Sequence, residues 1–259
     1  TIVVCIIENA DLPHPDLIGN AWYNFQEIPN NSLDDDANGY VDDFEGWNPQ
    51  NDNDNVYGGS HGTEVAGMIG AKGNNAEGVA GANWDVKMMV VTRQGVGEAQ
   101  VIESYTYPLV MRRIYNQTGG GKGAFVVATN ASWGIDNADP ADYPLWCALY
   151  DTLGTEGVLN CGATANNNVD IDAVGDMPTA CSSDFMISVP ATNTSDMRTF
   201  SGYGATTIDV GAPGDNVYTT EIGGGYTSTS GTSFASPLTA GVIGLICSSP
   251  CPSFAALMQ

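Results

Sequence analysis

The sequence predicts one α/β domain over residues 1–259, with a mostly parallel central sheet covered by helices on both faces. The 259 residues are enough to bury a large single core. Segments typical of strands alternate with segments typical of helices, as in parallel sheets with crossover helices. Several of the strand segments are apolar throughout, which indicates strands that are buried on both faces. No internal repeat or low-complexity linker divides the chain.

The strands are predicted from short apolar runs. The first run, 2–7, is rich in β-branched residues, which favour extended backbone. A loop rich in Asn and Asp fills about 30–60. Further strands are expected at 86–91, 124–129, 157–164 and 184–192, and the segment 207–212 precedes a Pro-Gly turn.

The helices are predicted at 64–69, 99–114 and 145–153, with a last apolar helix that begins at Ser233. Small residues in the first of these allow close packing. Pro108 lies inside the second, and we expect it to kink or shorten that helix because proline lacks the N–H that the preceding turn requires.

The charge of the chain excludes some partners. Its formal net charge is −23 and it has only seven Lys and Arg residues, so no basic patch is available to neutralise the phosphates of nucleic acid or an anionic membrane. No apolar run reaches the roughly 18–20 residues that would insert across a bilayer. The acid excess is consistent with bound cations or a salty, extracellular medium, and also with a simple solvated acidic surface.

The six cysteines show no spacing typical of a zinc site. Cys5 lies in the first apolar strand, and we expect a buried free thiol there. Cys161–Cys181 and Cys247–Cys251 are the candidate disulfides of an exported protein, although the sequence does not determine the pairing.

Two short motifs carry the chemistry. Ser233 follows Gly-Thr and begins the last apolar helix, which presents a hydroxyl at a helix N-terminus where developing negative charge is favoured. A Gly-Thr-Ser run alone is more often a turn or a cap. With His61 in the upstream run Ser-His-Gly-Thr, however, the pair predicts a serine nucleophile with a histidine base.

These motifs and their order resemble the subtilisin-like serine proteases, the subtilases, over nearly the full length of the chain. The resemblance implies a three-layer subtilisin-like fold and a serine endopeptidase that hydrolyses polypeptides. It also implies a secreted or cell-surface location, and we expect a bacterial secreted member of the family. His14, in a His-Pro-Asp-Leu run, resembles a structural turn of this family and receives no catalytic role.

The resemblance also assigns a binding site. The segment 157–166 looks like the family's buried strand ending in Ala-Gly-Asn, which makes Asn166 the side-chain donor to the oxyanion and the Ser233 N–H the second donor. Ala165 stands where glycine is usual. By the same resemblance, two segments line the pocket for the residue before the scissile bond: Ser132, Trp133 and Gly134, and Ala163, Thr164 and Ala165.

One position departs from the family. Glu8 follows the first strand where subtilases carry the triad aspartate, and Ala10 stands where glycine is usual. A carboxylate on a longer side chain can still orient an imidazole, as glutamate does in some hydrolases of other folds. The alternatives are Asp11 as the acid, or an impaired triad in a module that serves a binding or structural role in a surface assembly.

A separate motif in the acidic loop predicts calcium. Residues 34–45 match the pattern D-x-[DN]-x-[DN]-G-x₅-E, which places oxygen ligands at alternate positions with a glycine at the bend. A solvated acidic turn is the alternative. A weaker second group is Asp170, Asp172 and Asp176. The expected ligands in the loop are the side chains of Asp34, Asp36, Asn38 and Glu45, the carbonyl of Tyr40, and Asp42 directly or through water.

The ends of the chain predict a longer precursor. It opens at Thr1 directly in the first strand segment and closes within an apparent amphipathic helix at 253–259. We therefore expect further domains of the same precursor, or a surface assembly, among its partners.

Overall fold

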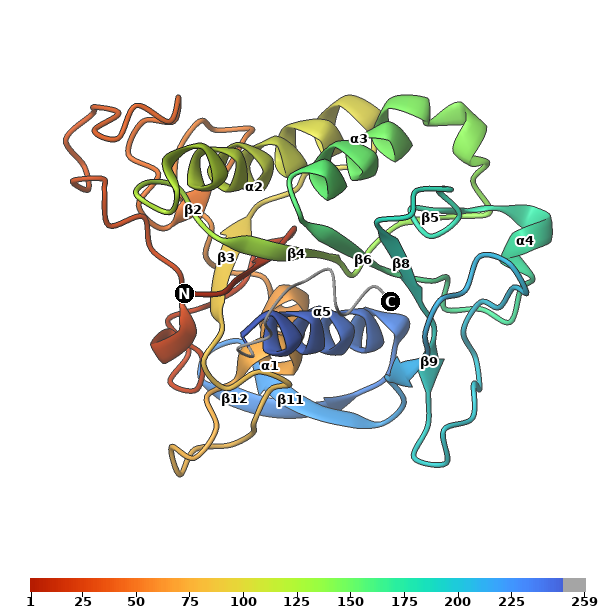
Figure 1. Ribbon diagram of the computed structural model, residues 1–259. Coiled ribbons are helices and arrows are strands. Elements are labelled where there is room, and N and C mark those ends of the chain that lie inside the picture. Colours follow the sequence, from red (N-terminus) through yellow and green to blue (C-terminus); the bar gives the residue numbers. More distant parts are fainter. Residues whose placement is uncertain (249–259) are drawn as a thin grey trace.

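The computed structural model describes residues 1–248 and has a six-stranded parallel sheet at its centre (Figure 1). The strand order is β2-β3-β1-β4-β6-β8, and every neighbouring pair in it is parallel. From β1 the chain adds β3 and β2 on one side and β4, β6 and β8 on the other, so β1 and β4 lie side by side in the middle of the sheet. The strands are β1 (Val3–Ile6), β2 (Gly46–Trp47), β3 (Lys87–Val91), β4 (Val126–Ala131), β6 (Leu159–Ala163) and β8 (Met186–Val189).

Helices cover both faces of this sheet, which makes the three layers that the sequence predicts (Figure 1). One face carries α2 (Glu98–Thr118) and α3 (Pro144–Thr155), and the other carries α1 (Ser60–Gly70) and α5 (Thr232–Ser248). Apolar side chains fill the space between sheet and helices on each side. The remaining helices are short: α4 (Ile171–Val174) and the 3₁₀ turns η1 (Ile18–Asn20) and η2 (Pro140–Asp142).

Within residues 1–248, three two-stranded sheets lie outside the central one. They pair β5 (Ile135–Asp136) with β7 (Asp176–Met177), β9 (Ala191–Thr192) with β10 (Ala212–Pro213), and β11 (Val217–Glu221) with β12 (Gly225–Thr229). The last pair is a hairpin that packs against α1. The hydroxyls of Thr219 and Thr220 donate to the carbonyls of Glu64 and Thr63, each at 2.7 Å.

The expectation that Pro108 shortens its helix is wrong. α2 is 21 residues long and continues through Pro108 to Thr118. Proline removes one backbone hydrogen bond, but this helix buries Tyr105, Tyr107 and Leu109 in the core. Burial of that apolar face outweighs the loss of one hydrogen bond.

The predicted Cys161–Cys181 disulfide is also wrong, because Cys181 is bonded to Cys147 of α3. Cys161 lies in β6 among the residues that pack toward α1 and α5, whereas Cys181 packs with the core under α2 and α3. Cys5 and Cys161 are both buried free thiols, as expected for Cys5. Cys251 lies outside the described residues, so the pairing expected for Cys247 stays a prediction.

No helix within residues 1–248 is both long enough and apolar enough to cross a membrane.

Candidate active site

The candidate active site lies where three strands of the central sheet end and two helices begin. Glu8 follows β1, Ser132 follows β4, and Asn166 follows β6. His61 and Ser233 are in the first turns of α1 and α5. Because the carboxyl ends of parallel strands meet at one edge of a sheet, residues more than 200 positions apart converge here.

Glu8 and His61 are in direct contact. Nδ1 of His61 lies 2.7 Å from Oε2 of Glu8. The close approach of β1 to α1 needs Gly62, since a Cβ at this position would lie 2.0 Å from the carbonyl oxygen of Asn9. Asp11 points elsewhere: its carboxylate accepts the N–H of Gly223 at 3.4 Å.

The surroundings of His61 shift its protonation. Burial lowers the pKa of His61, but the hydrogen bond and charge of Glu8, with the charge of Glu64, outweigh burial, so the net pKa is raised. The side chain of Glu8 is 14% exposed. Its other oxygen, Oε1, is buried and has no hydrogen-bond partner among residues 1–248.

Ser233 is 8% exposed, at the start of α5. Its hydroxyl donates to the carbonyl of Ser132 at 3.1 Å, while the hydroxyl of Ser132 donates back to the carbonyl of Ser233 at 2.7 Å. The ring of His61 lies 5.7 Å from that of Phe234, between centroids, which places the imidazole beside this helix start. Hydrogen bonds between catalytic groups are often long or misaligned before substrate binds.

Asn166 lies next to the same helix start. Its side-chain oxygen accepts the N–H of Thr232 at 2.9 Å, and the side-chain N–H groups of this exposed residue make no hydrogen bond within residues 1–248. The segment that carries it is held to α5 by the Thr232 hydroxyl, which donates to the carbonyl of Thr164.

The structure places both predicted pocket segments near Ser233. The segment 132–134 continues β4, and the indole N–H of Trp133 donates to the carbonyl of Ile7 at 2.7 Å. The segment 163–165 continues β6, and β7 passes next to both segments. Position 134 requires glycine, because a Cβ there would lie 2.1 Å from the carbonyl oxygen of Met177.

Two charged residues of this region were missed by the catalytic motifs. The guanidinium of Arg93 lies 4.2 Å from the centre of the Trp133 ring. The carboxylate of Asp176 accepts the N–H of Ala165 at 3.2 Å. The sequence gives Arg93 no role and names Asp176 only in the weaker acidic group, so only the folded chain brings the two residues to this site.

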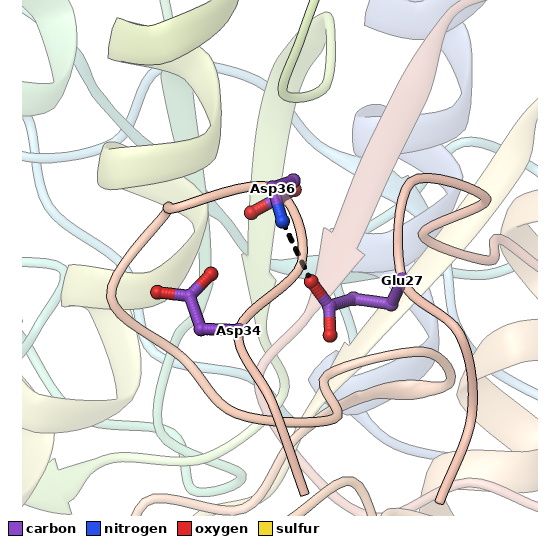
Figure 2. Close-up of side chains that lie close together, drawn as sticks. All are labelled: Glu27, Asp34 and Asp36. Atoms are coloured by element: carbon purple, nitrogen blue, oxygen red, sulfur yellow. Dashed lines mark hydrogen bonds between the residues drawn. The ribbon is translucent and has the colours of Figure 1, made fainter. Parts of the chain in front are cut away.

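The acidic loop forms a compact cluster. Figure 2 shows Glu27, Asp34 and Asp36, whose carboxylates offer oxygens that all lie within 4.8 Å of one another. Oε1 of Glu27 accepts the N–H groups of Asp35 and Asp36 at 2.9 and 3.1 Å. Glu27 is only 4% exposed, and its Oε2 is buried without a hydrogen-bond partner among residues 1–248.

The other predicted loop ligands have different surroundings. The N–H of Asn38 donates to Asp34 and Asp36, and its side-chain oxygen accepts the N–H of Tyr40. The carboxylate of Asp42 accepts two backbone N–H groups, at residues 31 and 32. Glu45 lies beside Asp54 instead. The cluster takes its glutamate from position 27, which the sequence pattern does not include.

The weaker second group is not assembled. Among the described residues, Asp170, Asp172 and Asp176 do not form a cluster within metal-binding distance. The carboxylate of Asp172 is taken up by the backbone N–H groups of residues 205–207, whereas Asp176 faces Ala165.

Comparison with known proteins finds relatives that are named as proteases. Subtilisin-like protease 1 of Plasmodium berghei is 27% identical over 96% of this chain and 43% of its own length. The extracellular basic protease of Dichelobacter nodosus is 28% identical over 95% of this chain and 43% of its own length. This chain thus spans less than half of either relative.

Solved structures share the fold. The S41 psychrophilic protease superposes with a TM-score of 0.69 at 23% identity, over 99% of this chain and 80% of that one. The sequence profile of the Subtilase family, Peptidase S8, matches residues 1–256. The chain therefore belongs to the subtilase family of serine endopeptidases.

Proposed function

We propose that this chain hydrolyses peptide bonds with Ser233 as nucleophile, His61 as general base and Glu8 as the acid that orients His61. The observation that carries the proposal is the 2.7 Å contact between Nδ1 of His61 and Glu8. An ionised Glu8 can only accept at this contact, so the contact favours the tautomer in which Nδ1 carries the proton and Nε2 is free to accept one.

The proposed reaction follows from these positions. Ser233 Oγ attacks the carbonyl carbon of the scissile bond, and its proton passes to Nε2 of His61. Glu8 stabilises the imidazolium that results. The side-chain N–H of Asn166 and the backbone N–H of Ser233 donate to the oxyanion at the positive end of α5. His61 then protonates the leaving amine, and water releases the acyl group by the same steps.

The substrate is proposed to bind as an extended polypeptide beside Ser132, Trp133 and Gly134. This segment follows β4, and a peptide can add to such an edge as a further strand. The residue before the scissile bond would then enter the space between this segment and Ala163, Thr164 and Ala165.

We further propose that the acidic loop holds a structural calcium ion. The residues fit the group, because Glu27 Oε2 is a buried acceptor beside Asp34 and Asp36 that has no hydrogen-bond partner within residues 1–248. Burial raises the pKa of Glu27, and the charges of Asp43 and Asp36 raise it further, so a cation would relieve this cluster. Glu27, Asp34 and Asp36 would hold the ion, and Asn38, Tyr40, Asp42 and Glu45 stay predictions as further ligands. The ion would supply charge neutralisation and tie the loop to the domain.

An extracellular location is part of the same proposal. The Cys147–Cys181 disulfide and a calcium-dependent loop both suit an oxidising, calcium-rich medium. The Dichelobacter relative carries the word extracellular in its name.

Two features of the site also suit the alternative function, a binding module with an impaired triad. In the described part of the chain, the buried Oε1 of Glu8 has no hydrogen-bond partner, and the Ser233 hydroxyl donates to the carbonyl of Ser132. Both features would also suit an impaired triad in a binding module.

Hydrolysis of an unfolded protein such as reduced casein separates the two. The enzyme predicts cleavage by the wild-type chain and none by Ser233→Ala. The binding module predicts no cleavage by either chain, with peptide binding retained.

A further inference from the structure

Asp176 is a buried carboxylate between the two proposed walls of the substrate pocket. It lies in β7, which pairs in antiparallel fashion with β5, and β5 begins directly after Gly134. Its carboxylate accepts the backbone N–H of Ala165, the neighbour of Asn166. Asp176 thereby connects the end of the β4 wall to the end of the β6 wall.

The carboxylate has few partners for its charge. Asp176 is only 1% exposed. The two hydrogen bonds that it accepts, from the Ala165 N–H and from the Thr179 hydroxyl, both end on Oδ2. Among residues 1–248 there are three ion pairs within 4.0 Å, and none of them includes Asp176.

A buried carboxylate without a cation is unfavourable when ionised. Burial, with a smaller contribution from the charge of Asp136 opposite it on β5, raises the pKa of Asp176 to about 7, although the hydrogen bonds from Thr179 and Ala165 act in the opposite direction. A cation beside Oδ1 or Oδ2 would lower the pKa of Asp176, because an opposite charge favours the ionised form.

We infer that Asp176 makes the primary pocket selective for a cationic side chain, lysine or arginine, at the residue before the scissile bond. The inference rests on the proposed function for the location of that pocket. A lysine or arginine that enters between the walls would bring its charge to a carboxylate that the fold holds in place. An uncharged side chain of similar length would leave the buried carboxylate unpaired.

The test compares substrates that differ only in this charge. Acetyl-Ala-Ala-Pro-X-p-nitroanilides with X as lysine or methionine have similar length, and the anilide fixes which residue precedes the scissile bond. We expect a kcat/KM for lysine at least about tenfold above that for methionine. Asp176→Asn should remove most of this preference while keeping an acceptor for the Ala165 N–H. Asp52→Asn, which removes one exposed charge on the loop after β2, should leave it unchanged.

A binding measurement makes the result independent of catalysis. The same two anilides are titrated against Ser233→Ala by fluorescence, and lysine should bind about tenfold more tightly. Equal binding of the two, or tighter binding of methionine, would overturn the inference even if the wild-type chain hydrolyses peptides. Tighter binding of the lysine anilide by Ser233→Ala, together with no hydrolysis by the wild-type chain, would sustain the inference and contradict the catalytic proposal instead. This arm needs no change at Asp176, so it does not depend on the folding of Asp176→Asn.

Discussion

Glu8 reaches His61 from the end of β1 with one methylene more than an aspartate would have. The contact of 2.7 Å shows that the backbone positions suit this longer side chain. The alternative acid, Asp11, faces the turn between β11 and β12. The sequence leaves this choice open because both carboxylates follow the same strand, and only the direction of each side chain separates them.

Shortening Glu8 should therefore impair the site. Glu8→Asp withdraws the carboxylate by about 1.5 Å, which breaks the contact unless the backbone moves. We expect kcat/KM to fall by about tenfold or more, and Glu8→Gln, which keeps the length but not the charge, to lower it by about 10²–10⁴-fold. Full activity of Glu8→Asp, measured on a peptide anilide, would show that the length of this side chain does not matter.

The raised pKa of His61 determines the acid limb of the pH profile. His61 must be neutral to accept the serine proton, so kcat/KM should rise with pH through a midpoint above the ordinary histidine value of about 6.5. Glu8→Gln removes the charge that favours imidazolium, and the midpoint should move to lower pH. The control is Glu64→Gln, which removes a more distant charge and should give a smaller shift in the same direction. A midpoint unchanged in Glu8→Gln would mean that Glu8 does not act on His61.

At the scale of elements, the junction between β1 and α1 depends on Gly62. A Cβ there would lie 2.0 Å from the Asn9 carbonyl oxygen, which is backbone and has little room to move. Gly62→Ala should lower the free energy of unfolding by about 2 kcal/mol or more and reduce activity through displacement of Glu8 from His61. Gly19→Ala, at a position where nothing lies within 4 Å of the added carbon, is the matched control. Chemical denaturation of both variants gives the comparison, and equal stability would exclude close packing at Gly62.

The acidic loop is the element that calcium should stabilise. At a calcium concentration about 100 times the dissociation constant, binding contributes about 2.7 kcal/mol, so EGTA should lower the Tm by several degrees. Glu27→Gln should remove most of this calcium-dependent shift. Glu45→Gln separates the structure from the sequence pattern, because Glu45 lies beside Asp54 rather than in the cluster. A calcium-dependent shift that survives Glu27→Gln and is lost in Glu45→Gln would restore the predicted loop ligands and contradict our assignment.

The sequence predicts the central elements well and the peripheral ones poorly. Apolar runs mark β1, β3, β4 and β6, because strands buried on both faces need apolar side chains throughout. The β11–β12 hairpin was missed because its sequence is rich in Thr, Gly and Tyr, and its contacts with α1 are hydroxyl hydrogen bonds. The helix through Pro108 was predicted too short, because local propensity gives no measure of tertiary burial.

For the whole molecule, the disulfide is the long-range constraint that the sequence does not determine. Cys147 and Cys181 are separated by 34 positions and meet only because α3 packs on the core that also contains Cys181. The candidate site divides in the same way. Motifs identify His61 and Ser233 directly. Glu27 lies outside the motifs, and Asp176 is named only in an acidic group that does not assemble, so the fold alone places Glu27 in its cluster and Asp176 beside Ala165.

Loss of this disulfide should destabilise the fold. Closing a loop of this length corresponds to about 3–4 kcal/mol in the chain-entropy account. Cys147→Ser should lower the free energy of unfolding by roughly that amount, measured by denaturant titration. Cys161→Ser changes a buried cysteine that is not bonded, and its effect should be independent of reducing agent. A wild-type chain whose stability is unchanged by reduction would contradict the bond.

If Glu8 orients His61 as proposed, Ser233 is an activated nucleophile. A fluorophosphonate probe reacts covalently with activated serines, and mass spectrometry identifies the labelled residue. With calcium present and folding verified by circular dichroism, we expect labelling of Ser233 in the wild-type chain, strong reduction in Glu8→Gln, and none in Ser233→Ala. A folded wild-type chain that remains unlabelled at Ser233 would rule out an activated serine and favour a subtilase domain that binds peptides without cleaving them.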